Sequence, residues 1–63
     1  MKSIEFERMN DVQIEQVGKA LETIINAYKE AGYSVFDSDM LYLYVSHYKS
    51  CYFELGRREG QRQ

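Results

Sequence analysis

Residues 28–39 read YKEAGYSVFDSD, a segment that holds the end of one helix and the start of another. Gly32 can take the left-handed conformation that ends a helix, and Lys29 suits the negative end of the helix dipole. Tyr33 can then fold back on Tyr28 as the apolar contact of a Schellman motif. We therefore predict that the chain turns sharply after Gly32.

The residues after this turn contain three candidate helix starts. Ser34, Asp37 and Ser38 can each serve as the N-cap of the second helix. We place this helix from residue 34 or 37 to residue 58, with residues 59–63 as a tail.

The helix before the turn is expected over residues 10–31. Asn10 can act as its N-cap, with Gln13 completing a capping box. Met9 and Ile14 stand at the two positions of a hydrophobic staple. These signals fix the predicted beginning of the first helix.

Apolar residues in this first helix recur at steps of three and four, which is typical of one packing seam. The seam comprises Ile14, Val17, Leu21, Ile24, Tyr28 and Ala31. Gly18 is expected beside this seam, where it weakens the helix by about 1 kcal/mol relative to Ala. Two interpretations stay open: the glycine admits a neighbouring backbone, or it is incidental.

Two helices of about 20 residues joined by a short turn pack as an antiparallel hairpin. The fold class is therefore predicted as all-α, in a single domain spanning residues 1–63. Within residues 1–9, Ile4 and Phe6 alternate with acidic residues as they would in a strand. No second strand is visible to pair with it, so a frayed terminus or short helical turn is preferred to an extended arm on a partner.

Residues 40–55 carry apolar or aromatic side chains on nearly every side of the second helix, whereas a helix with one buried face shows a single stripe. One seam comprises Met40, Tyr44, His47, Cys51 and Leu55. Its neighbour comprises Leu41, Val45, Tyr48, Tyr52 and Leu55. One seam is assigned to the first helix and the other to a partner, in an order that the sequence leaves open. Two hairpins paired in this way form a four-helix bundle, so we predict a homodimer.

The composition also favours association. A chain of 63 residues without proline, 44% of them hydrophobic, is expected to fold as one small domain. A core of this size alone yields roughly 3–5 kcal/mol, and small domains usually add disulfides, a metal or a partner. The single Cys51 excludes an intrachain disulfide, and one cysteine with one histidine cannot complete a metal site within one chain.

His47 and Cys51 are four residues apart and face the same way on a helix. In a twofold dimer, two copies of each would make a tetrahedral zinc site, but a buried thiol beside a half-buried histidine is the preferred interpretation. The sequence has no glycine-rich phosphate loop and no paired catalytic carboxylates. We therefore predict no enzymatic activity, no cofactor and no metal.

The formal net charge of −2 gives no support for a broad nucleic-acid-binding surface. The C-terminal end is positive through Arg57, Arg58 and Arg62. The first third is acidic through Glu5, Glu7, Asp11, Glu15 and Glu22, and this polarity can orient two antiparallel chains. No apolar run approaches the roughly 20 residues of a membrane span, and the N-terminus lacks the apolar core of a secretion signal. We expect a cytoplasmic protein with no membrane partner.

Tyrosine is the residue type that points to a function. Four of the six tyrosines lie in the second helix, and tyrosine is enriched at the energetic centres of protein interfaces. The candidate partner-binding residues are Tyr42, Tyr48, Tyr52 and Phe53, with Arg57 and Arg58 as a charged rim. We predict a small non-enzymatic regulator or inhibitor that binds another protein through this helical face. Two alternatives stay open: stacking of the tyrosines on RNA bases beside the arginines, and a purely structural homodimer.

Two short stretches carry family resemblances. Residues 48–51, followed by Gly56 and Gly60, resemble the plasmid repressor-of-primer family, which implies a dimeric four-helix bundle that binds paired RNA loops. This chain departs from that family at Ile14, where an exposed aromatic residue is expected. The turn after Gly32 resembles the small helical-hairpin phosphatases of sporulation response regulators, but their Ser-Gln-x-Leu-Asp signature is absent, since residues 44–48 read YVSHY. No site residues are transferred from either family.

Overall fold

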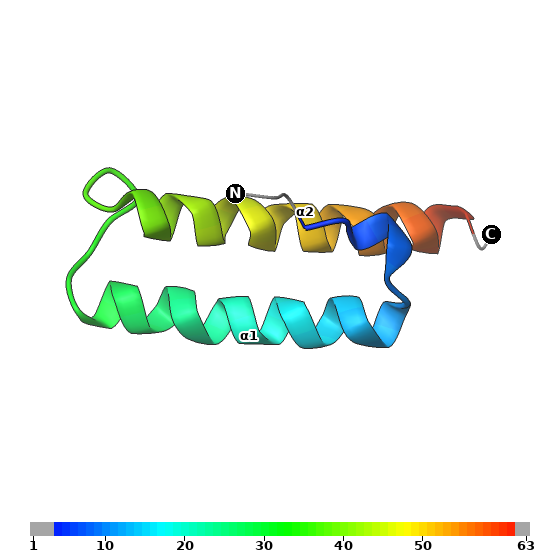
Figure 1. The fold of residues 1–63 in the computed structure, drawn as a ribbon, viewed down its shortest axis with the longest axis horizontal. Helices are drawn as coiled ribbons and strands as arrows, with labels where there is room; N and C mark the ends of the chain where they lie inside the picture. The colour runs from blue at the N-terminus through cyan, green and yellow to red at the C-terminus, as the bar shows by residue number, and fades with distance from the viewer. Residues whose placement is uncertain (1–3, 62–63) are drawn as a thin grey trace.

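The chain folds as a helical hairpin, seen in a computed structural model that describes residues 4–61. The helices α1 (Asp11–Glu30) and α2 (Asp39–Gln61) lie side by side and run antiparallel, as Figure 1 shows. A short 3-10 turn, η1 (Phe6–Arg8), precedes them and packs on α2. No strand occurs among the described residues. The predicted all-α antiparallel hairpin is confirmed.

The start of α1 has the predicted capping box. The Gln13 backbone N–H donates to Asn10 Oδ1 at 2.8 Å, and the Asn10 N–H donates to Gln13 Oε1 at 3.0 Å. Met9 packs against the cluster that contains Ile14, as a hydrophobic staple requires. Local signals alone therefore position this end of the hairpin.

The end of α1 is the predicted Schellman motif. Gly32 has φ of 92°, and its N–H donates to the carbonyl of Lys29 at 3.0 Å. The Tyr33 N–H donates to the Tyr28 carbonyl at 3.0 Å, and the two tyrosine rings meet edge-on with centroids 5.6 Å apart. These bonds satisfy the last carbonyls of α1 while the chain reverses.

The start of α2 is the last of the three candidates. The Ser38 hydroxyl accepts a hydrogen bond from the Leu41 N–H at 3.2 Å, so Ser38 is the N-cap. Ser34 and Asp37 instead form a turn, in which the Ser34 hydroxyl donates to Asp37 Oδ2 at 2.9 Å. The connection is therefore longer than a start at residue 34 or 37 would give.

The end of α2 differs from the prediction. The helix continues through residue 58, where we expected it to end, to Gln61. Gly56 was expected near the helix end, yet it lies inside the helix, and only Gly32 has a positive φ among the described glycines. A glycine ends a helix only where the backbone turns left-handed, and here the helical hydrogen bonds continue instead. Residues 62–63, with Arg62, lie outside the described residues.

The core consists of two small clusters between the helices. The first is formed by Phe6 of η1, Ile14 of α1 and Cys51 of α2. Leu21, Ile25 and Leu41 form the second, nearer the connection between the helices. Figure 1 shows the N-terminal segment running over α2 to the end of the hairpin where α1 begins. The N-terminal segment thus completes the core instead of extending to a partner, and the preferred interpretation of a short helical turn is correct for residues 6–8.

The packing seams differ from those predicted. In α1 the buried residues include Gly18 and Ile25, whereas Val17 and Ile24 are half-buried and Ala31 is exposed. Neighbouring seams on a helix share every second member, so sequence periodicity does not choose between them. The buried hydrophobic residues of α2 are Leu41 from one predicted seam and Cys51 from the other. The first helix therefore packs between the two seams of α2.

Gly18 lies on the packed face of α1 and contacts α2 closely. A Cβ atom built on Gly18 would lie 3.0 Å from Cys51 Sγ. The Cys51 thiol in turn donates a hydrogen bond to the Ile14 carbonyl at 3.1 Å. Gly18 is therefore not incidental, because α2 packs closely on it, but the predicted neighbouring backbone is wrong, since side chains of Cys51 and Tyr52 occupy the space.

Substituting alanine at the two interior helix glycines is expected to give opposite results. Gly56→Ala should raise the free energy of unfolding by about 1 kcal/mol, because alanine favours the helix and nothing lies within 4 Å of the added Cβ. Gly18→Ala should give no such gain, because the new methyl group presses on Cys51 Sγ. Urea unfolding followed by circular dichroism measures both values.

The Gly18 result has an internal control. In a Cys51→Ala background the sulfur atom is missing, so Gly18→Ala should become more favourable than in the wild-type chain. Equal gains for Gly18→Ala and Gly56→Ala in the wild-type background would contradict close packing at Gly18.

Candidate functional site

The tyrosines of α2 have three different environments. Tyr44 is half-buried, and its ring lies 5.9 Å from that of Tyr28 on α1. Tyr48 and Tyr52 form a pair with ring centroids 4.8 Å apart. Tyr42 is 64% exposed. The predicted tyrosine-rich face is therefore divided between different sides of the helix.

Tyr42 and Phe53 form what we call the outer face of α2. Phe53 is 77% exposed, more than Tyr42. The two residues are eleven positions apart, which is about three helical turns, so they project to the same side of the helix. Lys49 lies between them in sequence and is also exposed. The outer face thus presents two large aromatic side chains in line.

The Tyr48–Tyr52 pair lies on a different side of α2. Tyr48 is half-buried and packs against the second core cluster. Tyr52 is 47% exposed, and its ring lies within 4 Å of the position that a Cβ atom on Gly18 would take. The Tyr52 hydroxyl raises the pKa of Tyr48 above its ordinary value, because it favours the protonated phenol. This pair is partly core and partly surface.

The arginines expected on a charged rim are both bound to Glu54. Arg58 Nε donates to Glu54 Oε2 at 2.8 Å, and Arg57 Nε donates to Glu54 Oε1 at 3.2 Å. The side chain of Arg57 is 44% exposed, so it remains at the surface. The side chain of Arg58 is only 18% exposed. Arg57 therefore lies where a rim residue is expected, and Arg58 does not.

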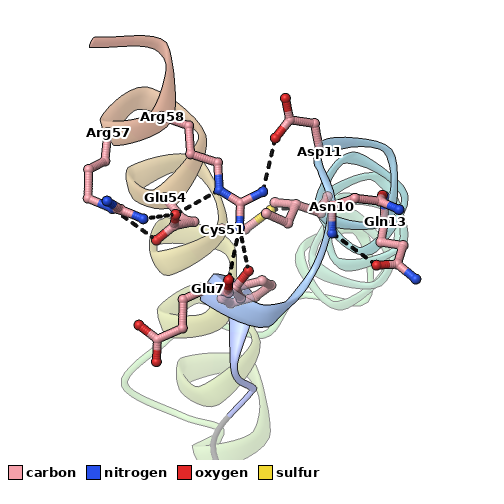
Figure 2. A network of polar contacts seen from close by, with 10 residues as sticks. Glu7, Asn10, Asp11, Gln13, Cys51, Glu54, Arg57 and Arg58 are labelled. Atoms are coloured by element: carbon pink, nitrogen blue, oxygen red, sulfur yellow. Dashed lines mark hydrogen bonds and ion pairs between the residues drawn. The ribbon is translucent and has the colours of Figure 1, made fainter. Parts of the chain in front are cut away.

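Arg58 joins α2 to the N-terminal segment and to α1. Figure 2 shows its guanidinium group between Glu54, Asp11 and the backbone of η1. One terminal nitrogen donates to Asp11 Oδ1 at 2.9 Å. The other donates to the carbonyl oxygens of Phe6 at 3.0 Å and Glu7 at 3.3 Å. The positive C-terminal end and the acidic first third of the sequence therefore meet within one chain, where the Arg58–Asp11 ion pair joins α2 to α1.

Glu54 is the centre of this network and was missed by the sequence analysis. The residue is only 9% exposed, and hydrogen bonds from Arg57 and then Arg58 hold the pKa of its carboxyl below the ordinary value. The same contact raises the pKa of Arg57. The spacing of three and four residues between Glu54 and the arginines is a helix ion-pair signal that was available in the sequence.

The residues considered for metal or nucleophilic chemistry do not assemble into a site. Cys51 is fully buried, and this burial raises the pKa of its thiol. His47 is half-buried on the same helix. Within residues 4–61, no group of three or more histidine, cysteine or carboxylate side chains is placed to hold a metal ion. In the same part of the chain, neither helix has the length and hydropathy of a membrane span.

Comparison of the chain with protein-family models finds no matching family, and comparisons with curated proteins and with solved structures find no significant match. The two family resemblances suggested by short sequence stretches therefore gain no support. A functional assignment for this chain depends on the chemistry of its own surfaces.

Proposed function

We propose that this protein acts by binding another protein through the outer face of α2, as a small non-enzymatic regulator or inhibitor. The observation that carries the proposal is the exposure of Phe53 (77%) and Tyr42 (64%) on one side of a regular helix. A large aromatic side chain exposed to water is unfavourable. Two such side chains on one side of a helix can serve as the anchors of a binding surface, which we call the docking strip. Arg57 lies one turn from Phe53 and supplies a charged edge to this strip.

The mode of binding that fits this face is a helix in a groove. Amphipathic helices dock through side chains along one side, and here the hydrophobic groove of the partner has to span about three turns, from Tyr42 to Phe53. Covering an aromatic side chain of this kind stabilises a complex by roughly 1.5–3 kcal/mol. The hydroxyl of Tyr42 can keep a polar contact at the edge of the groove.

The proposal includes a cytoplasmic location and no catalytic step. Cys51 has its thiol directed to the Ile14 carbonyl inside the core, where a substrate cannot reach it. Arg57 and Arg58 are balanced by the carboxylates of Glu54 and Asp11, so this end of α2 offers little free positive charge for RNA binding. Both observations favour protein binding over the other functions considered.

The test compares partners captured by matched variants from extracts of the host. The variant Tyr42→Ser/Phe53→Ser removes the outer face, and Val12→Ser removes a 62% exposed apolar side chain from α1 instead. A true partner should be retained by the wild type and by Val12→Ser and lost from the double variant. Titration calorimetry with the purified partner should then show Kd raised about thirtyfold or more in the double variant.

Circular dichroism of each variant controls for unfolding, which we do not expect, because neither aromatic side chain belongs to the core clusters. The proposal is wrong if every captured protein binds the wild type and the double variant equally. It is also wrong if the reconstituted complex has the same Kd for both.

A further inference from the structure

We propose that two copies of this chain associate antiparallel about a twofold axis, through the side of the hairpin that carries Tyr48 and Tyr52. This surface lies on a different side of α2 from Tyr42 and Phe53, and Lys49 borders both surfaces. A second copy is the occupant that the charges on this side select. The interface and its antiparallel orientation therefore do not depend on the identity of any other partner.

Two grooves flank the Tyr48–Tyr52 pair on this side. The first, which we call the acidic groove, is lined by Tyr52 together with Asp11, Glu15 and Glu59. The second, the basic groove, is lined by Tyr48 together with Ile25, Val45, Lys29 and Lys49. Glu22 also lines the basic groove and reduces its positive charge. The side therefore has an aromatic centre with Lys49 beside it, carboxylates toward one end and Lys29 toward the other end.

Most of the charged side chains that line the two grooves have no ion-pair partner among the described residues. Among residues 4–61, Glu15 and Glu59 take part in no ion pair, and neither do Lys29 and Lys49. Asp11 is different, because it binds Arg58. Carboxylates at one end and the Lys29 ammonium group at the other are complementary only when a second copy lies antiparallel, because a parallel copy places like charges together.

The spacing along the hairpin matches this orientation. Gly18 of α1 lies opposite Cys51 and Tyr52 of α2, which fixes how the two helices are aligned. With a rise of 1.5 Å per residue, Glu59 and Lys29 each lie about 14 Å from the midpoint of the tyrosine pair, in opposite directions. A twofold axis through that midpoint therefore brings Glu59 of one copy level with Lys29 of the other. It also brings the two tyrosine pairs together.

The exposed area of the chain leaves room for such an interface. The total accessible surface is 5014 Å², whereas a folded monomer of 7.5 kDa exposes about 4,250 Å². A standard interface covers about 800 Å² on each partner. Stable interfaces have aromatic residues at the centre and polar residues at the rim, and this side of the hairpin has the same arrangement.

Charge exchange provides the test. Sedimentation equilibrium across a concentration series should show a wild-type dimer whose Kd rises with salt, because exposed ion pairs are screened. Two variants make both grooves alike in charge: Lys29→Glu/Lys49→Glu and Glu15→Lys/Glu59→Lys. Each variant alone should dimerise at least tenfold more weakly than the wild type. An equimolar mixture of the two should regain association, because acidic ends then meet basic ends.

Two further variants locate the interface. Tyr52→Ala should raise the dimer Kd about thirtyfold, as expected for a central aromatic anchor. Tyr42→Ser/Phe53→Ser should leave the dimer unchanged. Circular dichroism shows whether each variant folds, and the salt dependence of the wild-type dimer requires no variant.

Three results would overturn the inference. The first is a monomer at every concentration, and the second is a dimer insensitive to both charge variants and to salt. The third is a dimer abolished by the outer-face variant and not by Tyr52→Ala. The first two results leave the capture of a different protein by the outer face untouched, so the two proposals can fail separately. The third would count against both proposals, because a second copy would then cover the outer face.

Discussion

Replacing Phe6 with alanine is expected to lower the free energy of unfolding by about 3 kcal/mol, the cost of removing a buried aromatic ring from a packed core. Phe6 is only 6% exposed and contacts the cluster formed with Ile14 and Cys51. A domain of this length has a total stability of roughly 3–5 kcal/mol, so the variant should be largely unfolded or unfold at very low urea concentrations. Urea titration followed by far-ultraviolet circular dichroism measures the loss.

The matched control for Phe6 is Phe36, which is 94% exposed in the connection between the helices. Phe36→Ala removes the same ring and should change stability by less than about 0.5 kcal/mol. All variants must be compared at one protein concentration, because self-association stabilises the folded state. If Phe6→Ala were no more destabilising than Phe36→Ala, the N-terminal segment would contribute nothing to the core.

The second large effect is expected from Arg58→Met, which should lower the free energy of unfolding by about 2 kcal/mol. Methionine keeps an apolar stem of similar length but removes the donors to Glu54, Asp11 and two backbone carbonyls of η1. The largely buried Glu54 carboxylate then retains only Arg57. Thermal unfolding by circular dichroism checks the change, with Arg57→Met as the control.

Arg57→Met should have the smaller effect, because the Arg57 side chain is 44% exposed and contacts Glu54 alone among the groups of this network. A pH titration gives a second readout. Since the arginines lower the pKa of Glu54 in the folded state, its contribution is complete above the ordinary pKa of 4.5 and is lost as pH falls through the folded value. Glu54→Gln should flatten this acid-side loss. Equal effects of the two arginine substitutions would contradict the bridging role of Arg58.

The parts of this fold that the sequence predicted are those determined by neighbouring residues. The capping box at Asn10 and the Schellman motif at Gly32 involve contacts within five positions, so their chemistry is legible without a structure. The hairpin followed from them, because two helices of similar length joined by a short connection bury their apolar sides when they pack back on each other. The start at Ser38 was one of three equivalent signals, and only the turn at Ser34 separated them.

The parts that the sequence did not predict depend on contacts between distant residues. Burial of Glu54 requires Arg58, and Arg58 in turn is oriented by Asp11, which lies 47 positions away in the chain. The choice of Gly18 and Ile25 over Val17 and Ile24 depends on where α2 lies. The division of the tyrosines among different sides of α2 has the same cause. Pattern alone shows that a helix has surplus apolar surface, not which neighbour covers each part.

The contact between Gly18 and Cys51 has a consequence for uniqueness. Two amphipathic helices joined by a loop can in principle slide past each other by a turn and bury equivalent apolar area in several registers. Here the sulfur atom fits above a position without a side chain, and a slide of one turn would bring it against residues that carry one. The thiol would also lose the Ile14 carbonyl as its acceptor. The glycine thus selects one register of the two helices. It contributes specificity at the expense of helix propensity.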